Sequence, residues 1–382
     1  MPVGGDPSLL SSVERIEPAM TFRIDLDPAM FPDRERLLCA CEGFSVSAFR
    51  YASGVPALRV TNRRGEITVL PYRGQQIWRA VFDGRDLTMK SMFDEPSASL
   101  VYLESYGAFL IHCGLTAIGA PAEGDDHTLH GELPNAAMRD CHLVIDEAAG
   151  QLTIVGTFRH TVAFSTDYEL TAELTLEADG ALLRSRLHVD NRKRSPMRLM
   201  YLAHVNFRPV DDARLVYTSP YTAEAVRVRT SIPGHITPGP GYGDFIGELA
   251  ADPSLHHVLR PGLAFDPEVV FTVDVVADDT GWAHALQRHP DGTADYVGHR
   301  PDQAPIVNRW ICRTPDQDAI GFSFPSTSNS GGRTLETREG RFVHLDGGES
   351  WDLDMRFGLM TAPEAASMAD HIERTMGRDP AG

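Results

Sequence analysis

Apolar and polar residues alternate along most of the chain from about residue 44 onward, which is typical of half-buried β-strands. One stretch of this kind has apolar residues at Tyr168, Leu170, Ala172, Leu174 and Leu176. The turn sequence Asp179-Gly180 then leads into a second alternating stretch that ends at Val189. Together the two stretches predict a β-hairpin with one buried face.

The same alternation returns near the C-terminus, from Trp351 to Phe357. Helical patterns are confined to the two ends of the chain. A short helix is expected from Asp33 to Cys41, and a longer one, preceded by Ala362-Pro363, from Glu364 to Met376. A strand-rich middle between isolated helices argues against alternating βαβ units. We therefore predict an all-β fold with short helices near the termini.

These elements predict one large domain with a small segment at each end. Residues 1–43 would form an N-terminal extension with a short helix, residues 44–360 a β-sandwich, and residues 361–382 a C-terminal helix and tail. The segment from Ile232 to Gly243 is rich in Pro and Gly, which predicts a long irregular loop. The basic triplet Arg192 to Arg194 precedes Ser195-Pro196 and is typical of an exposed hairpin turn.

Composition narrows the range of partners. A formal net charge of -18 would repel nucleic acid and anionic membrane surfaces, and no basic run offsets it. The five cysteines are scattered without CxxC spacing, which favours a reducing, cytoplasmic compartment. The N-terminus has no basic region followed by an apolar stretch, so no signal peptide is expected. No apolar run is long enough to span a bilayer.

Several common motifs are absent from the sequence. It contains no GxxxxGK[ST] phosphate loop, no GxGxxG after a strand, no GxSxG elbow and no HExxH. The sequence therefore gives no motif evidence for a nucleotide-binding protein, a dinucleotide-dependent enzyme or a serine hydrolase.

Three polar stretches remain as candidates for a site. The first is the RGQQI sequence that begins at Arg73, the second combines 114–121 with the LHGELPN sequence 129–135, and the third is the YLAHVNF sequence 201–207. Taken in this order, they resemble the aldose 1-epimerase superfamily, and within it an uncharacterised bacterial aldose 1-epimerase-like branch. The resemblance extends over roughly residues 65 to 360.

The resemblance implies a galactose mutarotase-like β-supersandwich that binds a monosaccharide or sugar derivative on its concave sheet. In the family, the histidine that matches His204 is the general acid, and the one that matches His130 contacts the sugar. Arg73 corresponds to an arginine that also contacts the substrate. Mutarotation requires one group to protonate the ring oxygen while another removes the proton of the anomeric hydroxyl, and it needs no redox cofactor.

The chain departs from the family pattern at two positions. The late segment that begins at Gly321 contains no acidic residue before Glu336. Glu336 or another carboxylate would then supply the base, or the chemistry has been lost or changed. Glu132 stands where the branch commonly has Arg, which reverses a charge beside His130 and would alter the substrate or recruit a metal.

Other residues are expected to complete the site. Asn206 should face the same way as His204, because residues two apart on a strand share a face. Lys90 and Arg309 are further candidate sugar contacts. Trp78 and Trp310 would either stack on a sugar or belong to the core.

Three interpretations of the function stay open. The first is an aldose 1-epimerase-like isomerase that interconverts sugar anomers or epimers by acid/base catalysis without a cofactor. The second is a metal-assisted isomerase or lyase acting on a sugar or keto-sugar, with His130, Glu132 and His204 as ligands of a divalent metal. The third is a sugar-binding or sugar-sensing protein that has lost the base. The sequence does not name the sugar and leaves the oligomeric state open, a homodimer included.

Overall fold

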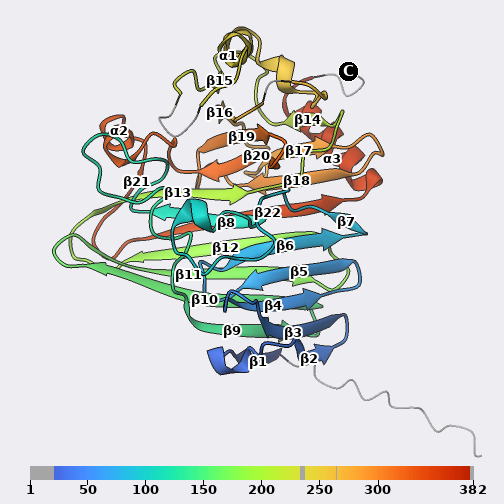
Figure 1. Ribbon diagram of the computed structural model, residues 1–382, viewed down its shortest axis with the longest axis vertical. Coiled ribbons are helices and arrows are strands. Elements are labelled where there is room, and N and C mark those ends of the chain that lie inside the picture. The colour runs from blue at the N-terminus through green and yellow to red at the C-terminus, as the bar shows by residue number, and fades with distance from the viewer. Residues whose placement is uncertain (1–20, 233–236, 264, 379–382) are drawn as a thin grey trace, which may run out of the picture.

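The computed structural model describes residues 21–232, 237–263 and 265–378. Over these residues the chain forms two large sheets that lie face to face, with short helices at their periphery (Figure 1). Neighbouring strands run antiparallel in both sheets. The prediction of an all-β sandwich is confirmed.

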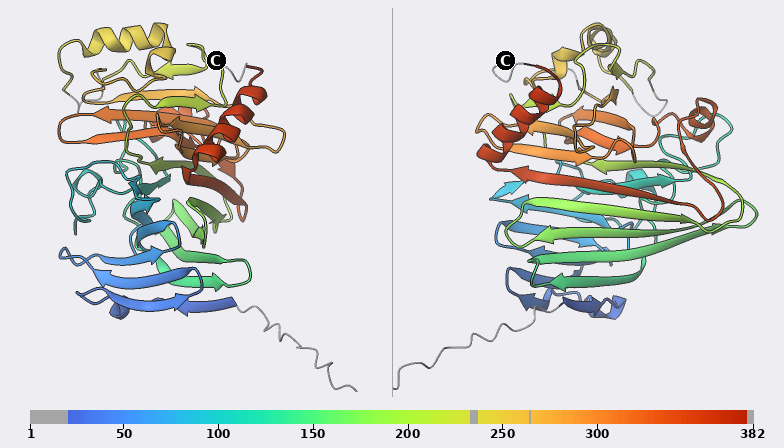
Figure 2. Two further views of the ribbon diagram at one scale, coloured as in Figure 1. Left: turned by 90° about the vertical axis from the view of Figure 1, so that its right-hand side faces the viewer. Right: turned by 180° about the vertical axis from the view of Figure 1, so that it is seen from behind.

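The first sheet has nine strands within the described part of the chain. Their spatial order is β1 (Thr21–Asp25), β9 (Arg139–Asp146), β10 (Gln151–Val162), β11 (Thr166–Glu177), β12 (Leu182–Asn191), β22 (Ser350–Met360), β18 (Ala294–His299), β17 (Ala283–Arg288) and β14 (Arg214–Tyr217). The long hairpin of β10 and β11 projects beyond the other strands (Figure 2).

The second sheet has thirteen strands, again counting only described residues. Their order is β15 (Val226–Val228), β16 (Val269–Asp274), β19 (Ile306–Arg313), β20 (Asp318–Ser326), β13 (Met197–Val205), β8 (Leu110–Leu115), β6 (Gln76–Phe82), β5 (Gly65–Leu70), β4 (Pro56–Thr61), β3 (Phe44–Arg50) and β2 (Arg36–Cys41), with β21 (Val343–Leu345) on β13 and β7 (Arg85–Asp86) on β6. Strand β13 therefore lies well inside this sheet.

The main hydrophobic core fills the space between the two sheets. Along β11, every second residue from Tyr168 to Leu176 is buried there, and β12 contributes Leu183 and Leu187 in the same way. Burying a large apolar side chain stabilises the fold by about 1.5–3 kcal/mol. The hairpin predicted from this alternation is confirmed.

Both outer faces are partly covered. On the outer face of the thirteen-stranded sheet, a second apolar cluster that includes Trp78 and Trp310 is packed under Tyr102 and Tyr106, which come from the segment between β7 and β8. On the outer face of the nine-stranded sheet, helix α3 (Ala362–Thr375) packs on a smaller cluster (Figure 2). The capping box of Thr361 and Glu364 starts α3, as expected for a helix in this region.

Two expectations about helices are wrong. The segment Asp33 to Cys41 is not helical, because residues 36–41 pair with β3 as strand β2 and extend the sheet edge. Helices are also not confined to the ends, since α1 (Tyr242–Ala251) and α2 (Arg333–Arg338) lie between strands. Strands β1 and β2 both belong to the sheets, so the sandwich starts before residue 44.

Two connections also differ in detail from the prediction. Part of the Pro/Gly-rich segment, residues 233–236, lies outside the described residues, and its end belongs to helix α1. The basic triplet 192–194 joins β12 to β13, which belong to different sheets, so it forms a crossover rather than a hairpin turn. No described helix is long and apolar enough to cross a membrane.

Candidate functional site

Side chains along strand β13 point alternately into the core and towards the candidate site on the outer face of the sheet. Tyr201 and Ala203 point into the core between the sheets, whereas Met200 and Leu202 belong to the apolar cluster on the outer face. Since side chains alternate along a strand, His204 points to the same outer face as Leu202. There its ring lies 4.1 Å, centre to centre, from the ring of Phe324 on β20.

Asn206 fixes the orientation of the His204 imidazole. The amide nitrogen of Asn206 donates to the carbonyl oxygen of Ala108 at 2.9 Å, so its Oδ1 must face the other way. This oxygen accepts from the Tyr106 hydroxyl at 3.2 Å and lies 2.6 Å from Nδ1 of His204. Nδ1 therefore carries the hydrogen, and Nε2 of His204 is left with a lone pair.

His130 lies beside His204 on the loop before β9. Its ring centre is 5.6 Å from that of His204, and the two planes are nearly perpendicular. Its Nδ1 accepts from the backbone N–H of Gly119 at 3.4 Å, which places the hydrogen of the neutral ring on Nε2. The two histidines thus offer one donor nitrogen and one acceptor nitrogen.

Both imidazoles are uncharged at neutral pH. Burial lowers the pKa of His130 to about 4, with a smaller contribution from His127. Burial also holds the pKa of His204 well below its usual 6.5, and the neighbouring His130 lowers it further. The hydrogen bond that Nδ1–H of His204 donates to Oδ1 of Asn206 raises the pKa and offsets only part of this effect.

Aromatic rings surround the two histidines. Tyr102 lies 4.9 Å from His130, and Tyr106 and Trp310 lie 5.5 and 5.6 Å from His204, all measured between ring centres. Tyr102, Tyr106 and Trp310 are each about nine-tenths buried, and together with His130 and His204 they are called the histidine site below. The rings of this site pack against one another and leave only small parts of Tyr102, Tyr106, Trp310 and His204 exposed.

Glu268, the residue before β16, was not predicted from the sequence. One of its carboxylate oxygens accepts from the Trp310 indole N–H at 2.7 Å, and the other accepts from Arg229 at 2.6 Å. Glu268 thus holds Trp310 in place at the edge of the histidine site. Its sequence context carries no motif, so only the contact across β16 and β19 reveals it.

Three basic residues were predicted to contact the sugar: Arg73, Lys90 and Arg309. Among the described residues, no hydrogen bond joins any of them to His204. The guanidinium of Arg73 donates to the carbonyl groups of Ser97, Ala98 and Ser99, and so anchors the loop that carries Tyr102. Lys90 is exposed, and its ammonium group donates to the carbonyl of Pro315 at 3.3 Å.

Arg309 points to the opposite face of β19 from Trp310. It is fully buried, donates to the carbonyl of Phe322 at 2.8 Å, and its charge lies over the ring of Tyr217 at 4.0 Å. Its Nη1 is 2.6 Å from Nε2 of His256. Its contacts are therefore with the protein interior.

Comparison with known proteins identifies this architecture. Residues 52–223 match the family model of a domain of unknown function, DUF4432, and no curated protein matches the chain by sequence. A candidate aldose 1-epimerase from Klebsiella pneumoniae has a solved structure that aligns with a TM-score of 0.79 at 17% identity, over 96% of this chain and 100% of its own. A galactose mutarotase-like protein from Clostridium acetobutylicum aligns with a TM-score of 0.54 at 13% identity, over 84% and 100%. The chain has the galactose mutarotase-like fold.

A third solved structure with this mutarotase-like fold is that of a galactose 1-epimerase from Lactobacillus acidophilus. It aligns with a TM-score of 0.54 at 12% identity, over 90% of this chain and 99% of its own. The fold predicted from the sequence resemblance is thus confirmed.

In this version of the mutarotase-like fold, Glu132 has a local structural role. One oxygen accepts from the backbone N–H groups of Leu115 and Thr116, at 3.0 and 3.1 Å, and from the hydroxyl of Tyr168 at 2.6 Å. The other accepts from the hydroxyl of Thr116 at 2.6 Å. These contacts hold Glu132 to the end of β8 and to β11, and no hydrogen bond among the described residues joins it to His130 or His204.

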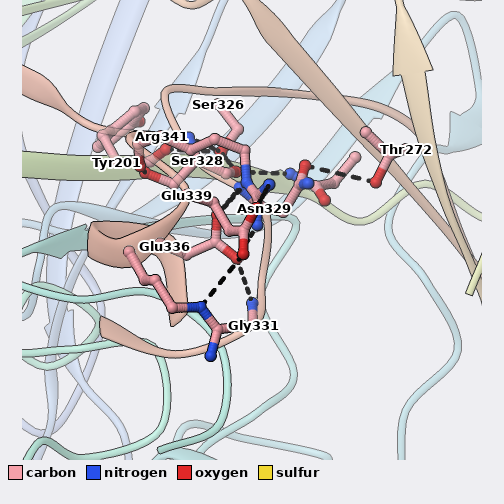
Figure 3. A network of polar contacts seen from close by, with 11 residues as sticks. Tyr201, Thr272, Ser326, Ser328, Asn329, Gly331, Glu336, Glu339 and Arg341 are labelled. Atoms are coloured by element: carbon pink, nitrogen blue, oxygen red, sulfur yellow. Dashed lines mark hydrogen bonds and ion pairs between the residues drawn. The ribbon is translucent and has the colours of Figure 1, made fainter. Parts of the chain in front are cut away.

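Glu336, the expected base, is likewise surrounded by donors. Its side chain is fully buried and accepts from the backbone N–H groups of Asn329 and Gly331, at 3.0 and 3.2 Å, and from Arg341 at 2.7 Å. Figure 3 shows this network. No described residue links Glu336 to His204 by a hydrogen bond. Its contacts stabilise the segment between β20 and α2.

A groove of about 760 Å³ opens elsewhere on the molecule. It reaches Met200 on β13, four residues or about 13 Å along the strand from His204. Its charged lining is entirely basic, from Lys193, Arg198, Arg333 and Arg338. Arg333 is paired with Asp126, and Arg338 with Glu339. This groove is separate from the histidine site.

Proposed function

We propose that the protein is an aldose 1-epimerase-like isomerase that accelerates the interconversion of sugar anomers at the histidine site. The observation that carries this proposal is the pair of neutral imidazoles, with a lone pair on Nε2 of His204 and a hydrogen on Nε2 of His130. A hemiacetal carries a hydroxyl that must lose a proton and a ring oxygen that must gain one, both on the same carbon.

His204 serves as a proton shuttle in this proposal. Its Nε2 takes the proton of the anomeric hydroxyl, and the resulting imidazolium delivers the proton to the ring oxygen as the bond between this oxygen and the anomeric carbon breaks. The product is the open-chain aldehyde, which rotates and closes again by the reverse steps. Because the pKa of His204 is low, its protonated form is a strong acid that readily gives the proton back.

His130 acts as a neutral hydrogen-bond donor. A neutral imidazole does not give up its remaining N–H proton near neutral pH, so His130 stabilises developing negative charge on a sugar oxygen without transferring a proton. Tyr106, Trp310 and Tyr102 supply the apolar walls, and Glu268 holds Trp310 in position. This mechanism needs neither a catalytic carboxylate nor a redox cofactor.

The proposed substrate is a monosaccharide or a sugar derivative. Lys90 and Arg309 are not part of the proposed site, since their contacts lie elsewhere. We also propose a cytoplasmic location, which is supported by the five free cysteines at Cys39, Cys41, Cys113, Cys141 and Cys312.

The test measures the rate of anomer exchange by NMR saturation transfer in a broad panel of aldoses and sugar phosphates. The wild-type protein should accelerate exchange of at least one sugar, and His204→Gln should lower kcat/KM by about 10²-fold or more, the scale for losing one acid/base group. His344→Gln, at an exposed histidine on β21, is the matched control and should retain full activity. If no sugar responds to the wild-type protein, the isomerase proposal is wrong.

The alternative function is sugar binding without turnover. This alternative is favoured by the contacts of Glu336 and Glu132. Both carboxylates accept hydrogen bonds from other groups, and neither is hydrogen-bonded to His130 or His204, so neither is placed as a catalytic base. Calorimetry would then detect sugar binding in the wild-type protein without any acceleration of anomer exchange. Turnover by the wild-type protein would rule this alternative out.

A further inference from the structure

Three metal-ligating side chains meet beneath helix α3, on the outer face of the nine-stranded sheet. Asp278 comes from the connection between β16 and β17, His284 from β17 and His371 from α3. His284 shares a face of its strand with Leu286, which packs on α3. The cluster thus links the C-terminal helix to the sheet, away from the histidine site on the other sheet.

Two of the three distances between ligand atoms in the cluster are close to those around a bound metal ion. Oδ2 of Asp278 lies 3.0 Å from Nε2 of His284 and 2.9 Å from Nε2 of His371, and the three atoms are all within 4.8 Å of one another. Two ligand atoms that each lie about 2.1 Å from one ion are about 3.0 to 3.4 Å apart for angles between octahedral and tetrahedral values. Small movements of the side chains would therefore suffice to coordinate an ion.

The surrounding residues hold two of the three ligands in place. The other oxygen of Asp278 accepts from the backbone N–H groups of Thr280 and Trp282, at 2.9 and 3.0 Å, and from the Thr280 hydroxyl at 2.8 Å. Nδ1 of His284 lies 2.9 Å from the hydroxyl of Tyr296. Metal-ligating histidines usually donate their second ring N–H to such an oxygen, which leaves Nε2 free for the metal.

The charge near the cluster has both signs. Asp278 is its one acidic side chain, and the positive charge of Arg356 is stacked on the indole of Trp282, 4.8 Å from the ring centre.

We propose that Asp278, His284 and His371 bind one divalent first-row transition-metal ion, such as Zn²⁺, that fastens α3 to the sheet. Two imidazoles and one carboxylate are a ligand set for Zn²⁺ and its neighbours rather than for Mg²⁺ or Ca²⁺, which prefer oxygen ligands. Without the ion, the Nε2–H groups donate to Asp278. On binding, the ion replaces the hydrogen at each Nε2, and each neutral imidazole then carries its hydrogen on Nδ1, which in His284 faces the Tyr296 hydroxyl.

The experiment titrates the full-length, tag-free and metal-stripped protein with Co²⁺. The expected result is a visible d–d absorption band that saturates at one equivalent, that Zn²⁺ abolishes by competition, and that is accompanied by a higher Tm. His371→Asn should remove the saturable band. Tyr296→Phe should weaken Co²⁺ binding by about 10-fold or more, the scale for losing an outer hydrogen bond to a metal ligand.

His188→Asn is the matched control. His188 lies between Asp190 and Asp352, at 3.2 and 2.8 Å, but the carboxylates contact opposite ring nitrogens and cannot hold one ion together with the ring. This variant should bind Co²⁺ like the wild-type protein. His371 is about one-third exposed, so its replacement keeps the fold even if the buried Asp278→Asn variant does not form. Absence of saturable binding in the wild-type protein, or equal binding by His371→Asn and wild type, would overturn the proposal.

Discussion

At the residue scale, the environment of an imidazole decides which proton chemistry it performs. His204 is surrounded by aromatic rings and oriented by Asn206, so at neutral pH it stays uncharged with a lone pair on Nε2, whereas an ordinary histidine would be partly charged. The motif around His204 and Asn206 was sufficient to predict that they share a face. The motif alone did not indicate whether His204 gives or takes the proton first, because that depends on the hydrogen bond at Nδ1.

The pH dependence of the reaction tests this protonation state. The pKa of His130 is about 4, and that of His204 is well below 6.5. Both groups therefore stay neutral as the pH falls through 6.5, and kcat/KM for anomer exchange should remain constant there. The value of kcat/KM should decrease only as the pH approaches about 4, where His130 becomes protonated. An acid limb with a midpoint near 6.5 in the rate profile would contradict the proposed role of His204.

The carboxylates show what the sequence could not reveal. Glu132 and Glu336 were candidates because they stand near family motifs, yet both carboxylates accept hydrogen bonds away from the histidines. The donors to Glu336 are five to seven residues away in the sequence, whereas those to Glu132 are at least sixteen residues away. Glu268 has a contact at the histidine site but no motif around it. Which N–H group faces a carboxylate is set by the three-dimensional path of a loop, which alternation and spacing do not specify.

At the scale of elements, pairing between strands overrides local preference. Residues 36–41 have a helical pattern, but they satisfy their backbone groups by pairing with β3 at the edge of the sheet. Helix α1 was missed because its first residues belong to the Pro/Gly-rich segment that indicates a loop. By contrast, β11, β12, β22 and α3 were predictable, since each has a long periodic pattern that agrees with its final contacts.

The connection from β20 to α2 gives a prediction at this scale. Glu336→Gln replaces a buried carboxylate that accepts from two backbone N–H groups and from Arg341, and it should lower the free energy of unfolding by about 1.5–3 kcal/mol. The measurement is urea denaturation. In the folded protein, kcat should stay close to the wild-type value. Unchanged stability combined with a loss of about 10²-fold in kcat would instead show that Glu336 is the base.

At the scale of the whole molecule, several buried histidines make the fold sensitive to acid. Burial lowers the pKa of both His112 and His299 to about 4, and they are only 2% and 1% exposed. In the unfolded chain their pKa would be about 6.5. Between these two values the unfolded state binds more protons than the folded state, so protonation favours unfolding.

Stability should therefore decrease as the pH is lowered from about 6.5 towards 4, by up to about 1.4 kcal/mol per pH unit for each such histidine. Urea midpoints measured over this range would show the slope. His112→Gln should flatten it, whatever its effect on stability at neutral pH. A midpoint that does not change between pH 7 and pH 5, or an unchanged slope in the variant, would contradict this prediction.

The alternation along β13 has a consequence for how proteins of this architecture can diverge. Odd-numbered positions such as Tyr201 and Ala203 belong to the seam between the sheets, while even-numbered positions such as Leu202 and His204 border the histidine site. A substitution at an even-numbered position can therefore alter ligand recognition without disturbing the packing of the core between the two sheets. Alternate positions of one strand can therefore change independently, one set affecting stability and the other affecting specificity.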